Sequence, residues 1–490
     1  MFSPVLDAAQ VRLFEGGLVD DLGIASLELM ERAGRCCANH IVGRWPDLEH
    51  VGIVCGTGNN GGDGFVIARH LCALGIDVRL AVAGDLQKIH GDALVNFNRL
   101  DERGLKLGTI EEALTEVDVV IDALFGIGLN RALSEDHLAV VQQINQIDVP
   151  VVSIDMPSGL DASTGVTHGG AITAALTITF FAPKVGLLTG AGPAFRGQVV
   201  ICDLETSASS NFASAVPAAL RLDLSEVPDF PTRARVAHKG DAGFALLVGG
   251  NVGYEGAIRL AAQAATRAGA GLTAVVTHCE NTQVTVQYPE IMCRRTDDPA
   301  VLRELGSRAS FLAVGPGLGT DHWSQAMLRG VLAAQKPIVI DADALNLLAG
   351  DPARREDWIL TPHPGEAARL LGCSSAEVQA DRLAAAAEIQ RLYGGIVVLK
   401  GAGTVIARAK QPPVILDFAD PRLASGGMGD VLTGIIVAFG AQGLAPDIAA
   451  VSACWLHARA CSHLTLAAGV LAGDVVGALP AVLSEIALSG

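Results

Sequence analysis

The sequence predicts two α/β domains, each built around a buried parallel sheet, and three observations lead to this fold class. The chain has 490 residues, more than a single ordinary hydrophobic core accommodates. Short apolar runs of strand length alternate with helical stretches in both halves. The stretch 206–243, which is first Ser- and Ala-rich and then punctuated by prolines, interrupts that alternation. We therefore place the boundary near 207–225, between domains 1–215 and 225–490.

In the N-terminal half, an amphipathic helical pattern over 6–44 precedes the first strand-like run. The runs that follow are β-branched and continuously apolar, as expected of strands buried on both faces of a parallel sheet. This pattern predicts a doubly wound, Rossmann-like sheet. The expected strands are VGIVCG (51–56), VRLAVAG (78–84), VDVVIDALFG (117–126), VPVVSIDMPSG (149–159), ALTITFFAP (175–183) and QVVICDL (198–204).

The same rhythm restarts after the boundary and predicts a larger α/β domain with a central sheet. A Gly-rich turn, SGGMGD (425–430), then leads into a long apolar helical region. The expected strands are FALLVGG (244–250), LTAVVTH (272–278), SFLAVGPGLG (310–319), PIVIDADAL (337–345), WILTPHPGE (358–366), GIVVLKGAG (395–403) and PVILDF (413–418).

Composition and charge exclude one class of partner. The net charge is −17, from 35 basic and 52 acidic residues, so the chain lacks the positive charge that neutralises a phosphate backbone. Aromatic residues make up only 4% of the chain, which argues against stacking platforms for single-stranded nucleic acid. We expect no nucleic-acid partner. An apolar content of 50% is compatible with the homo-oligomer that we expect.

The ten cysteines are scattered along the sequence, with no CxxC pair and no evident Cys/His cluster. This distribution argues against structural zinc and against a disulfide framework. The N-terminal residues have neither the basic region nor the apolar core of a signal peptide. The apolar tail around 470–483 is not typical of a membrane span, because it contains Asp474 and Pro480. We therefore expect a cytoplasmic protein without a membrane partner.

The first chemical motif is GTGNNGGDG (56–64), which lies between a predicted strand and a predicted helix. Its glycines allow a tight turn and close backbone approach, and the helix N-terminus offers free N–H groups to a phosphate. The motif matches neither G-x-G-x-x-G nor a Walker A sequence, because it has no Lys. A plain turn with an Asn or Asp helix cap is the alternative. The density of Asn, Gly and Asp63 favours a ligand site.

Two further aspartates follow predicted strands of the same half, namely Asp122 in IDALFGIGLNR and Asp155 in SIDMPSG. Ligands of a parallel sheet lie at the carboxyl ends of its strands, so Asp63, Asp122 and Asp155 are expected to share one crevice. A helix cap is the usual role of a single such residue, but three together favour a site. Asn60, Asp122 and Ser158 offer oxygen donors and no soft ligand, which suits a hard cation.

In the C-terminal half, SGGMGD (425–430) is the most informative motif. Its glycines and the following helix N-terminus form an anion hole of backbone N–H groups. Asp430 beside that hole can accept the proton of a substrate hydroxyl as the hydroxyl oxygen attacks phosphorus. A helix start with a capping Asp would explain one Gly and Asp430 but not the whole run. Phosphoryl transfer is therefore the favoured interpretation.

Other motifs of this half have weaker signals. DADALN (341–346) places Asp341 and Asp343 at a strand end, which suits a magnesium-linked network or a capped helix start. His363 stands between two prolines, where a substrate contact is favoured over a loop hydrogen bond. Lys400 ends a strand, where its cation and the following N–H groups can meet a nucleotide phosphate.

With these motifs in view, residues 1–215 resemble the YjeF-type NAD(P)H-hydrate epimerases, through GNNGGDG, IDALFGIGL and IDMPSG. The resemblance implies K⁺ bound by Asn60, Asp122 and Ser158. It implies that Asp155 contacts the nicotinamide hydrate and acts in acid/base chemistry. The residues implied to hold the hydrated dinucleotide are Asn59, Asn60, Gly61, Gly62, Asp63, Gly126, Ile127, Gly128, Leu129, Asn130, Arg131 and Ala132.

Residues 230–487 resemble the ribokinase-like superfamily and, within it, the ADP-dependent NAD(P)H-hydrate dehydratases. The match rests on KGDAG, GGNVGYEGA, GPGLG, DADALN, TPHPGE, LKGAGTVI and SGGMGD in this order. It implies ADP or AMP contacts at Lys400, Gly401, Ala402, Gly403, Thr404 and Gly429. It implies hydrate contacts at Ala257, Gly317, His363 and Asp430.

The two resemblances together imply a bifunctional repair enzyme. The first domain would interconvert the R and S epimers of NADHX and NADPHX. The second would phosphorylate the ring hydroxyl of the S epimer with ADP and eliminate phosphate, giving NAD(P)H, AMP and phosphate. One segment departs from the pattern: DFADPRLASGGMGD has Asp420, Pro421 and Arg422 where an Asn/Gly-rich lead-in is usual.

Two alternatives remain open at the level of the sequence. The C-terminal half could be a kinase for a small hydroxylated compound, with the N-terminal half as a regulatory domain. In the second alternative, the N-terminal half is a non-catalytic nucleotide-binding or protein-interaction module. A kinase leaves a stable phosphoester, whereas a dehydratase releases phosphate and regenerates reduced nicotinamide. The presence of Asp63, Asp122 and Asp155 counts against pure binding.

Overall fold

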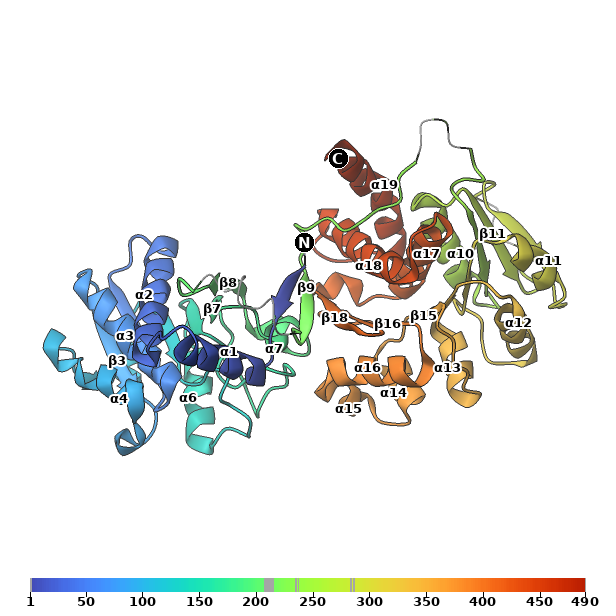
Figure 1. Cartoon of the computed structure of the whole chain (residues 1–490). Coiled ribbons are helices and arrows are strands. Elements are labelled where there is room, and N and C mark those ends of the chain that lie inside the picture. The colour runs from blue at the N-terminus through green and yellow to red at the C-terminus, as the bar shows by residue number, and fades with distance from the viewer. Residues whose placement is uncertain are drawn as a thin grey trace. The chain divides into compact units, whose positions relative to one another are not determined.

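The computed structural model describes residues 2–206, 216–233, 236, 238–282, 284 and 287–489. Contacts divide the chain into two compact units, drawn in Figure 1. One unit is Ser3–Leu220, and the other is Arg221–Gly490 with Met1–Phe2. Residues 207–215 of the predicted boundary lie outside the described residues.

The N-terminal unit is a parallel sheet in the order β4-β3-β2-β5-β6-β7-β8, covered by helices. Alternate strand residues enter different core clusters: Ile53 and Ile121 lie in one, Val54 and Val120 in the other. Both faces of the sheet are therefore buried, as the continuous apolar runs predict. The strands are β2 (His50–Cys55), β3 (Asp77–Val82), β4 (Leu107–Gly108), β5 (Val119–Ala123), β6 (Val151–Ile154), β7 (Leu176–Phe180) and β8 (Gln198–Cys202), and a short β1 (Ser3–Val5) precedes the helices.

The amphipathic pattern over 6–44 is two helices rather than one. The chain turns between them at Gly23, whose φ of 67° is left-handed and ends a helix readily. An apolar pattern alone does not reveal such a break, because both helices bury the same kind of face. The helices of this unit are α1 (Ala8–Asp20), α2 (Ser26–Arg44), α3 (Asn59–Ala73), α4 (Gly91–Asn98), α5 (Ile110–Leu114), α6 (Glu135–Asn145), α7 (Val185–Leu188) and α8 (Gly192–Phe195).

Much of the predicted Gly-rich turn is the start of α3, which begins at Asn59. The glycines there allow close packing of helix against strand. A Cβ on Gly61 would lie 2.0 Å from the carbonyl oxygen of Gly56, and one on Gly64 would lie 2.5 Å from Sγ of Cys55. Side chains are thus excluded at the point where α3 leaves the sheet.

The C-terminal unit contains the strand order β18-β17-β16-β15-β14-β13-β10-β11-β12. Strands from β16 to β12 are parallel, whereas β17 is antiparallel to both of its neighbours. The strands are β10 (Phe244–Val248), β11 (Leu272–Thr277), β12 (Met292–Arg295), β13 (Phe311–Val314), β14 (Ile338–Ile340), β15 (Trp358–Leu360), β16 (Ile396–Leu399), β17 (Val405–Arg408) and β18 (Gln411–Leu416), and β9 (Ala219–Leu222) contains the division between the units.

Helices lie on opposite faces of this sheet in Figure 1, with α17 and α18 on one side and α14, α15 and α16 on the other. Among the described residues, no helix is both long and apolar enough to cross a membrane. The helices are α10 (Glu255–Arg267), α11 (Val301–Arg308), α12 (His322–Ala333), α13 (Ala342–Gly350), α14 (Pro364–Leu371), α15 (Ser375–Ala380), α16 (Arg382–Tyr393), α17 (Met428–Ala441), α18 (Pro446–His463) and α19 (Ala472–Ser489).

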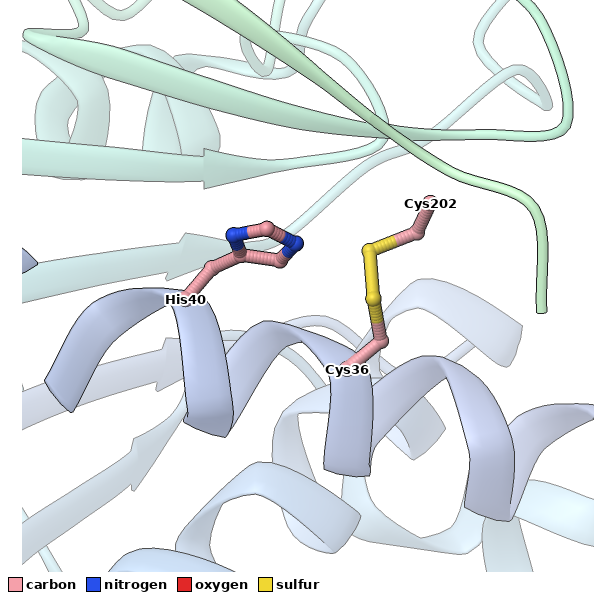
Figure 2. A group of neighbouring side chains, drawn as sticks. All are labelled: Cys36, His40 and Cys202. Carbon is pink, nitrogen blue, oxygen red and sulfur yellow. A yellow bond between two sulfur atoms is a disulfide. The ribbon is translucent and has the colours of Figure 1, made fainter. Parts of the chain in front are cut away.

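One pair of cysteines corrects the interpretation of the cysteine distribution. Cys36 of α2 and Cys202 of β8 form a disulfide, although 166 residues separate them in sequence. His40 lies one helical turn after Cys36 and faces the same place, as Figure 2 shows. A Cys/His cluster is therefore present, but its sulfurs are joined to each other and are not the thiolates that bind metals. The sequence could not reveal the pair because only the fold brings the two residues together.

We expect the disulfide to stabilise the N-terminal unit, because it crosslinks residues distant in sequence and so restricts the unfolded chain. Cys36→Ser should lower the free energy of unfolding of that unit by about 2–4 kcal/mol under non-reducing conditions. Thermal unfolding with and without reductant measures the effect. The exposed free Cys279 offers the control Cys279→Ser, which should change nothing. Equal unfolding temperatures of Cys36→Ser and the oxidised wild type would contradict the expectation.

Candidate active sites

The first site lies where the strand order of the N-terminal sheet reverses, between β2 and β5. Such a switch point opens a crevice at the carboxyl ends of the strands. Gly56 follows β2 and donates its N–H to Ala123 of β5, at 2.9 Å. Gly58 is the N-cap of α3, and no side chain caps the helix. The first N–H groups of α3 therefore remain available to an anion, and the Asn or Asp cap of the alternative interpretation is absent.

Asp122 is fully buried and organises the next strand ends. Its carboxylate accepts hydrogen bonds from Ser158 Oγ at 2.6 Å, Ser158 N at 2.9 Å and Ser153 Oγ at 2.8 Å. Burial raises its pKa, and the hydrogen bonds from Ser158, Ser153 and Leu124 oppose that rise. The predicted pair of Asp122 and Ser158 is thus in direct contact.

Asn60, the third predicted cation ligand, is also buried. Its Nδ2 has no hydrogen-bond partner, whereas buried amides are nearly always paired. Ser158 Oγ also bonds to Phe125, accepting from N at 2.9 Å and donating to O at 3.2 Å. The three residues offer hard oxygen donors, whereas the unsatisfied Nδ2 of Asn60 is a hydrogen-bond donor and not a cation ligand. This donor set is compatible with a hard cation.

Asp155 has a strained backbone, with a left-handed φ of 65°. Such strain in a non-glycine residue is typical of functional sites. Its Oδ1 accepts hydrogen bonds from the ammonium of the buried Lys184 and from Thr179 Oγ1. Its Oδ2 points the other way, because a Cβ built on Gly126 would lie 3.2 Å from it. One oxygen is anchored, and the other faces the predicted substrate loop that begins at Gly126.

A second buried carboxyl group belongs to Asp63 of α3. Burial raises its pKa well above the ordinary value, and the nearby charges of Asp155 and Glu15 raise it further. Asp63, Asp122 and Asp155 therefore all occupy the carboxyl edge of one sheet, as the sequence predicts. The sequence analysis missed Lys184 and Glu15. Lys184 follows the FFAP end of a predicted strand, and that position is the only signal available for it.

The second site is the glycine turn before α17. Gly427 has a left-handed φ of 89° and is the N-cap of the helix. A Cβ on Gly426 would meet no atom within 4 Å, whereas one on Gly427 would lie 2.6 Å from Leu260 Cδ1, so the turn is open at Gly426 and packed at Gly427. Asp430 is in the first turn of α17. Burial, together with the charge of Asp341, raises the pKa of Asp430 to about 7, although Lys400 opposes the rise.

Lys400 is at the centre of a cluster of carboxylates next to this turn. Its Nζ is 2.8 Å from Asp341 Oδ1 and 3.8 Å from Glu366 Oε2. A Cβ on Gly429 would be 3.2 Å from the same Nζ, so the ammonium lies beside the N-terminus of α17. The neighbouring carboxylates raise the pKa of Lys400 against the effect of burial. The ammonium is therefore positioned where a phosphate would meet the helix.

Asp341 occupies the N-cap position of α13, as the alternative interpretation of DADALN suggests, but it does not cap the helix with its side chain. Its Oδ2 instead accepts from Thr433 Oγ1 of α17 at 2.8 Å. Asp343 accepts from the N–H of Gly319 at 2.8 Å. These carboxylates join the strand ends to α17 and to the 315–319 turn. Two residues of the cluster, Glu366 and Thr433, were not among the predicted site residues.

The loop after Lys400 is supported from within by a buried arginine. Arg382 NH2 donates to the carbonyl oxygens of Leu399 at 3.2 Å and Lys400 at 3.3 Å. Burial lowers the pKa of this guanidinium to about 10. Gly401 has a left-handed φ of 144°, and a Cβ there would be 2.9 Å from the guanidinium. Arg382 thus holds the start of the predicted nucleotide loop in place, and the exposed Gly401 and Ala402 of the loop face solvent.

The predicted hydrate contacts fall into two groups. A Cβ on Gly317 would lie 3.2 Å from the Cβ of Ala257, so these two residues are neighbours. His363 has a structural role: its Nδ1 accepts from Gly365 N at 2.9 Å as the N-cap of α14. Burial, Lys400 and Arg369 lower its pKa. Its contact with substrate stays a prediction.

The unusual lead-in before the glycine turn is an ordered segment. Arg422 binds both oxygens of Asp420, with NH2 at 2.6 Å from Oδ2. The same guanidinium donates to the carbonyl oxygens of Leu464 at 3.0 Å and Leu466 at 2.8 Å. Asp420 and Arg422 therefore attach this lead-in to the segment after α18.

Comparison with known proteins gives matches to both halves. Residues 26–186 match the family described as YjeF-related protein N-terminus, and residues 245–480 match the family described as NAD(P)H-hydrate dehydratase. A Coxiella burnetii protein named bifunctional NAD(P)H-hydrate repair enzyme Nnr is 41% identical over 453 residues, which cover 92% of this chain and 93% of that protein.

This chain belongs to the bifunctional NAD(P)H-hydrate repair enzyme family. An Escherichia coli protein of the same name is 39% identical, over 97% of this chain and 93% of that protein. The solved structure of a ribokinase-like superfamily protein from Enterococcus faecalis has 30% identity and a TM-score of 0.50, covering 54% of this chain and 96% of that chain. The ribokinase-like fold predicted for the C-terminal half of this NAD(P)H-hydrate repair family member is confirmed.

Proposed function

We propose that this protein repairs hydrated NADH and NADPH in two coupled steps. The N-terminal unit interconverts the R and S epimers of the hydrate. The C-terminal unit dehydrates the S epimer with ADP, giving NAD(P)H, AMP and phosphate. The glycine turn at 426–429, which is open at Gly426 and has Asp430 and Lys400 beside it, supports this proposal best. A kinase of a small hydroxylated compound is disfavoured by the family to which both halves belong.

The dehydration follows from the groups around the turn. Asp430 accepts the proton of the ring hydroxyl while the hydroxyl oxygen attacks the β-phosphorus of ADP. The bond between that phosphorus and AMP breaks. Lys400 and the free N–H groups of α17 stabilise the charge on the transferred phosphoryl group. The ring C–O bond of this phosphate ester then breaks and phosphate leaves, while the adjacent ring carbon loses a proton, which restores the double bond. The oxygen of the hydrating water ends in the phosphate.

The carboxylates of Asp341, Asp343 and Glu366 fit a role in holding Mg²⁺ with the nucleotide. They are oxygen donors beside the proposed phosphate position, and burial raises the pKa of Glu366. Magnesium there would neutralise charge on the phosphates. Lys400, Gly401, Ala402, Gly403, Thr404 and Gly429 bind ADP in this proposal. Ala257, Gly317, His363 and Asp430 contact the hydrate.

In the N-terminal unit, the turn at Asn59–Asp63 and the loop at Gly126–Ala132 hold the dinucleotide. Asp155 presents its Oδ2 to the hydrated ring and exchanges protons with it. Asn60, Asp122 and Ser158 hold K⁺, and the supporting observation is that all three are buried residues with oxygen donors, with Asp122 and Ser158 in direct contact. The domains are 1–215 and 225–490, and the protein works in the cytoplasm as a homo-oligomer.

The decisive experiment is incubation of the full-length protein with mixed hydrate epimers and either ADP or ATP. Absorbance of reduced nicotinamide and inorganic phosphate are followed together. We expect one phosphate for each reduced cofactor, and complete consumption of both epimers with ADP. Accumulation of a stable phosphoester without reduced cofactor would identify a kinase instead. Consumption of the S epimer alone would show that the N-terminal unit is not an epimerase.

A further inference from the structure

We propose that Glu15 is a second acid/base residue of the epimerisation site, acting as the acid that protonates the ring hydroxyl as it leaves. The proposal rests on the epimerase function assigned above to the N-terminal unit. No motif of the sequence analysis includes Glu15, and the chemistry described so far does not use it.

Helix α1 carries Glu15 to the site. Its buried face holds Val11 and Leu18 in the core, and the ring of Phe14 packs edge-on against Phe181 at 5.0 Å. One turn before Glu15, Arg12 NH2 donates to the carbonyl oxygen of Ile127 at 3.2 Å, within the proposed substrate loop. Glu15 therefore lies on a helix that is anchored to the sheet on one side and to the substrate loop on the other.

Four charged groups interact electrostatically with the carboxyl group of Glu15. Asp155 follows β6, Lys184 precedes α7, Arg12 is on α1 itself, and Asp63 of α3 feels the charge of Glu15 in turn. Asp155 is the residue whose free oxygen faces Gly126. Glu15 thus interacts with two carboxyl groups of the site, those of Asp155 and Asp63.

Glu15 and Asp155 have different environments. The carboxylate of Asp155 receives the ammonium of Lys184 directly. Glu15, by contrast, makes no hydrogen bond or ion pair with any other residue in the described part of the chain, although it is partly buried. Burial, with the charge of Asp155, raises the pKa of Glu15 to about 7. An unpaired carboxyl beside a paired carboxylate is the usual division between an acid and a base in one site.

The chemistry of the hydrate requires such a pair. The hydroxyl is on a ring carbon bonded to the ring nitrogen, whose lone pair can expel it once it is protonated. Glu15 donates that proton, the C–O bond breaks, and water leaves behind a ring iminium. A water molecule then adds to the opposite face and gives a proton to Asp155, which produces the other epimer. Solvent exchange returns both carboxyl groups to their starting states, so the step consumes nothing.

The test is Glu15→Gln in the full-length protein, assayed for exchange between purified epimers from pH 6 to 8.5 and corrected for the uncatalysed rate. General acid catalysis contributes about 10²- to 10⁴-fold, so we expect kcat to fall at least about 10²-fold with little change in KM. The wild-type rate should decrease as pH rises through about 7, because Glu15 loses its proton there. This limb should be absent in Glu15→Gln, and Glu15→Asp should restore part of the rate.

Two controls separate the possible failures. Asp20→Asn changes an exposed acid of the same helix and should leave exchange unchanged. The dehydratase activity on the S epimer, measured in the same preparation, reports on the remainder of the chain.

Exchange by Glu15→Gln within threefold of wild type, or an unshifted pH limb in Glu15→Asp, would overturn the proposal while leaving the epimerase function intact. Absence of exchange in the wild type itself would overturn both the Glu15 proposal and the epimerase function. If Glu15→Gln does not fold, the pH limb of Glu15→Asp decides.

Discussion

Asp430→Asn should reduce dehydration by about 10²- to 10⁴-fold while leaving ADP binding within a few fold of wild type. The amide keeps the size of the side chain but cannot accept the hydroxyl proton. In the wild type, kcat should rise with pH up to about 7, because Asp430 must lose its proton before it can act as a base. Steady-state kinetics from pH 5.5 to 9 and ADP titration by calorimetry provide the measurements.

The same substitution should make the C-terminal unit more stable at neutral and alkaline pH. The pKa of Asp430 is higher in the folded protein than the ordinary 3.8, so the folded state binds its proton more tightly. The contribution of Asp430 to the free energy of unfolding therefore decreases as pH rises from about 4 to about 7, by at most about 4 kcal/mol. Asp430→Asn removes this pH dependence. The exposed Asp351 provides the control Asp351→Asn. Near-wild-type dehydration by Asp430→Asn would exclude Asp430 as the base.

Asp155→Ala should reduce epimer exchange to the uncatalysed rate, since it removes the carboxylate oxygen that faces Gly126. The loss of Asp155 also leaves the buried Lys184 without its counter-charge, which costs about 3–5 kcal/mol of stability in comparable sites. Exchange between epimers is measured directly, and the dehydratase activity of the same chain serves as the internal reference.

A double variant separates loss of chemistry from loss of structure. In Asp155→Asn with Lys184→Met, the ammonium and its partner are both replaced, so no buried charge is left unpaired. We expect this protein to unfold near the wild-type temperature and still fail to exchange epimers. Recovery of exchange in the double variant would show that Asp155 serves only to neutralise Lys184, and another group would have to act on the ring.

The strands and the strand-end residues were predictable because both depend on local sequence. A buried parallel strand is a continuous apolar run, and the chain turns polar where the run ends, so Asp122, Asp155 and Asp341 could be placed at the sheet edges from the sequence alone. The glycine turn at 426–429 was predictable for the same reason. The turn is open at Gly426 and packed at Gly427, and the anion hole inferred from its composition stays a prediction.

Residues that reach the sites from elsewhere could not be predicted in this way. Lys184 and Glu15 carry no local motif, and only the fold brings them to Asp155. The break at Gly23 was missed because two consecutive amphipathic helices have the same apolar period as one. Cys36 and Cys202 illustrate the same limit, since their pairing depends on where α2 crosses the end of β8. Periodicity describes elements, whereas contacts between distant elements require the topology.

The attachment of Arg422 to Asp420 and to the carbonyl oxygens of Leu464 and Leu466 has a consequence for ligand capture. In the function proposed above, a nucleotide that binds beside this lead-in would meet a backbone already held in place by Arg422. Preorganised sites lose less entropy when they engage a ligand and release it more slowly. Arg422→Ala should therefore make the off-rate of ADP faster, with the association rate changed much less.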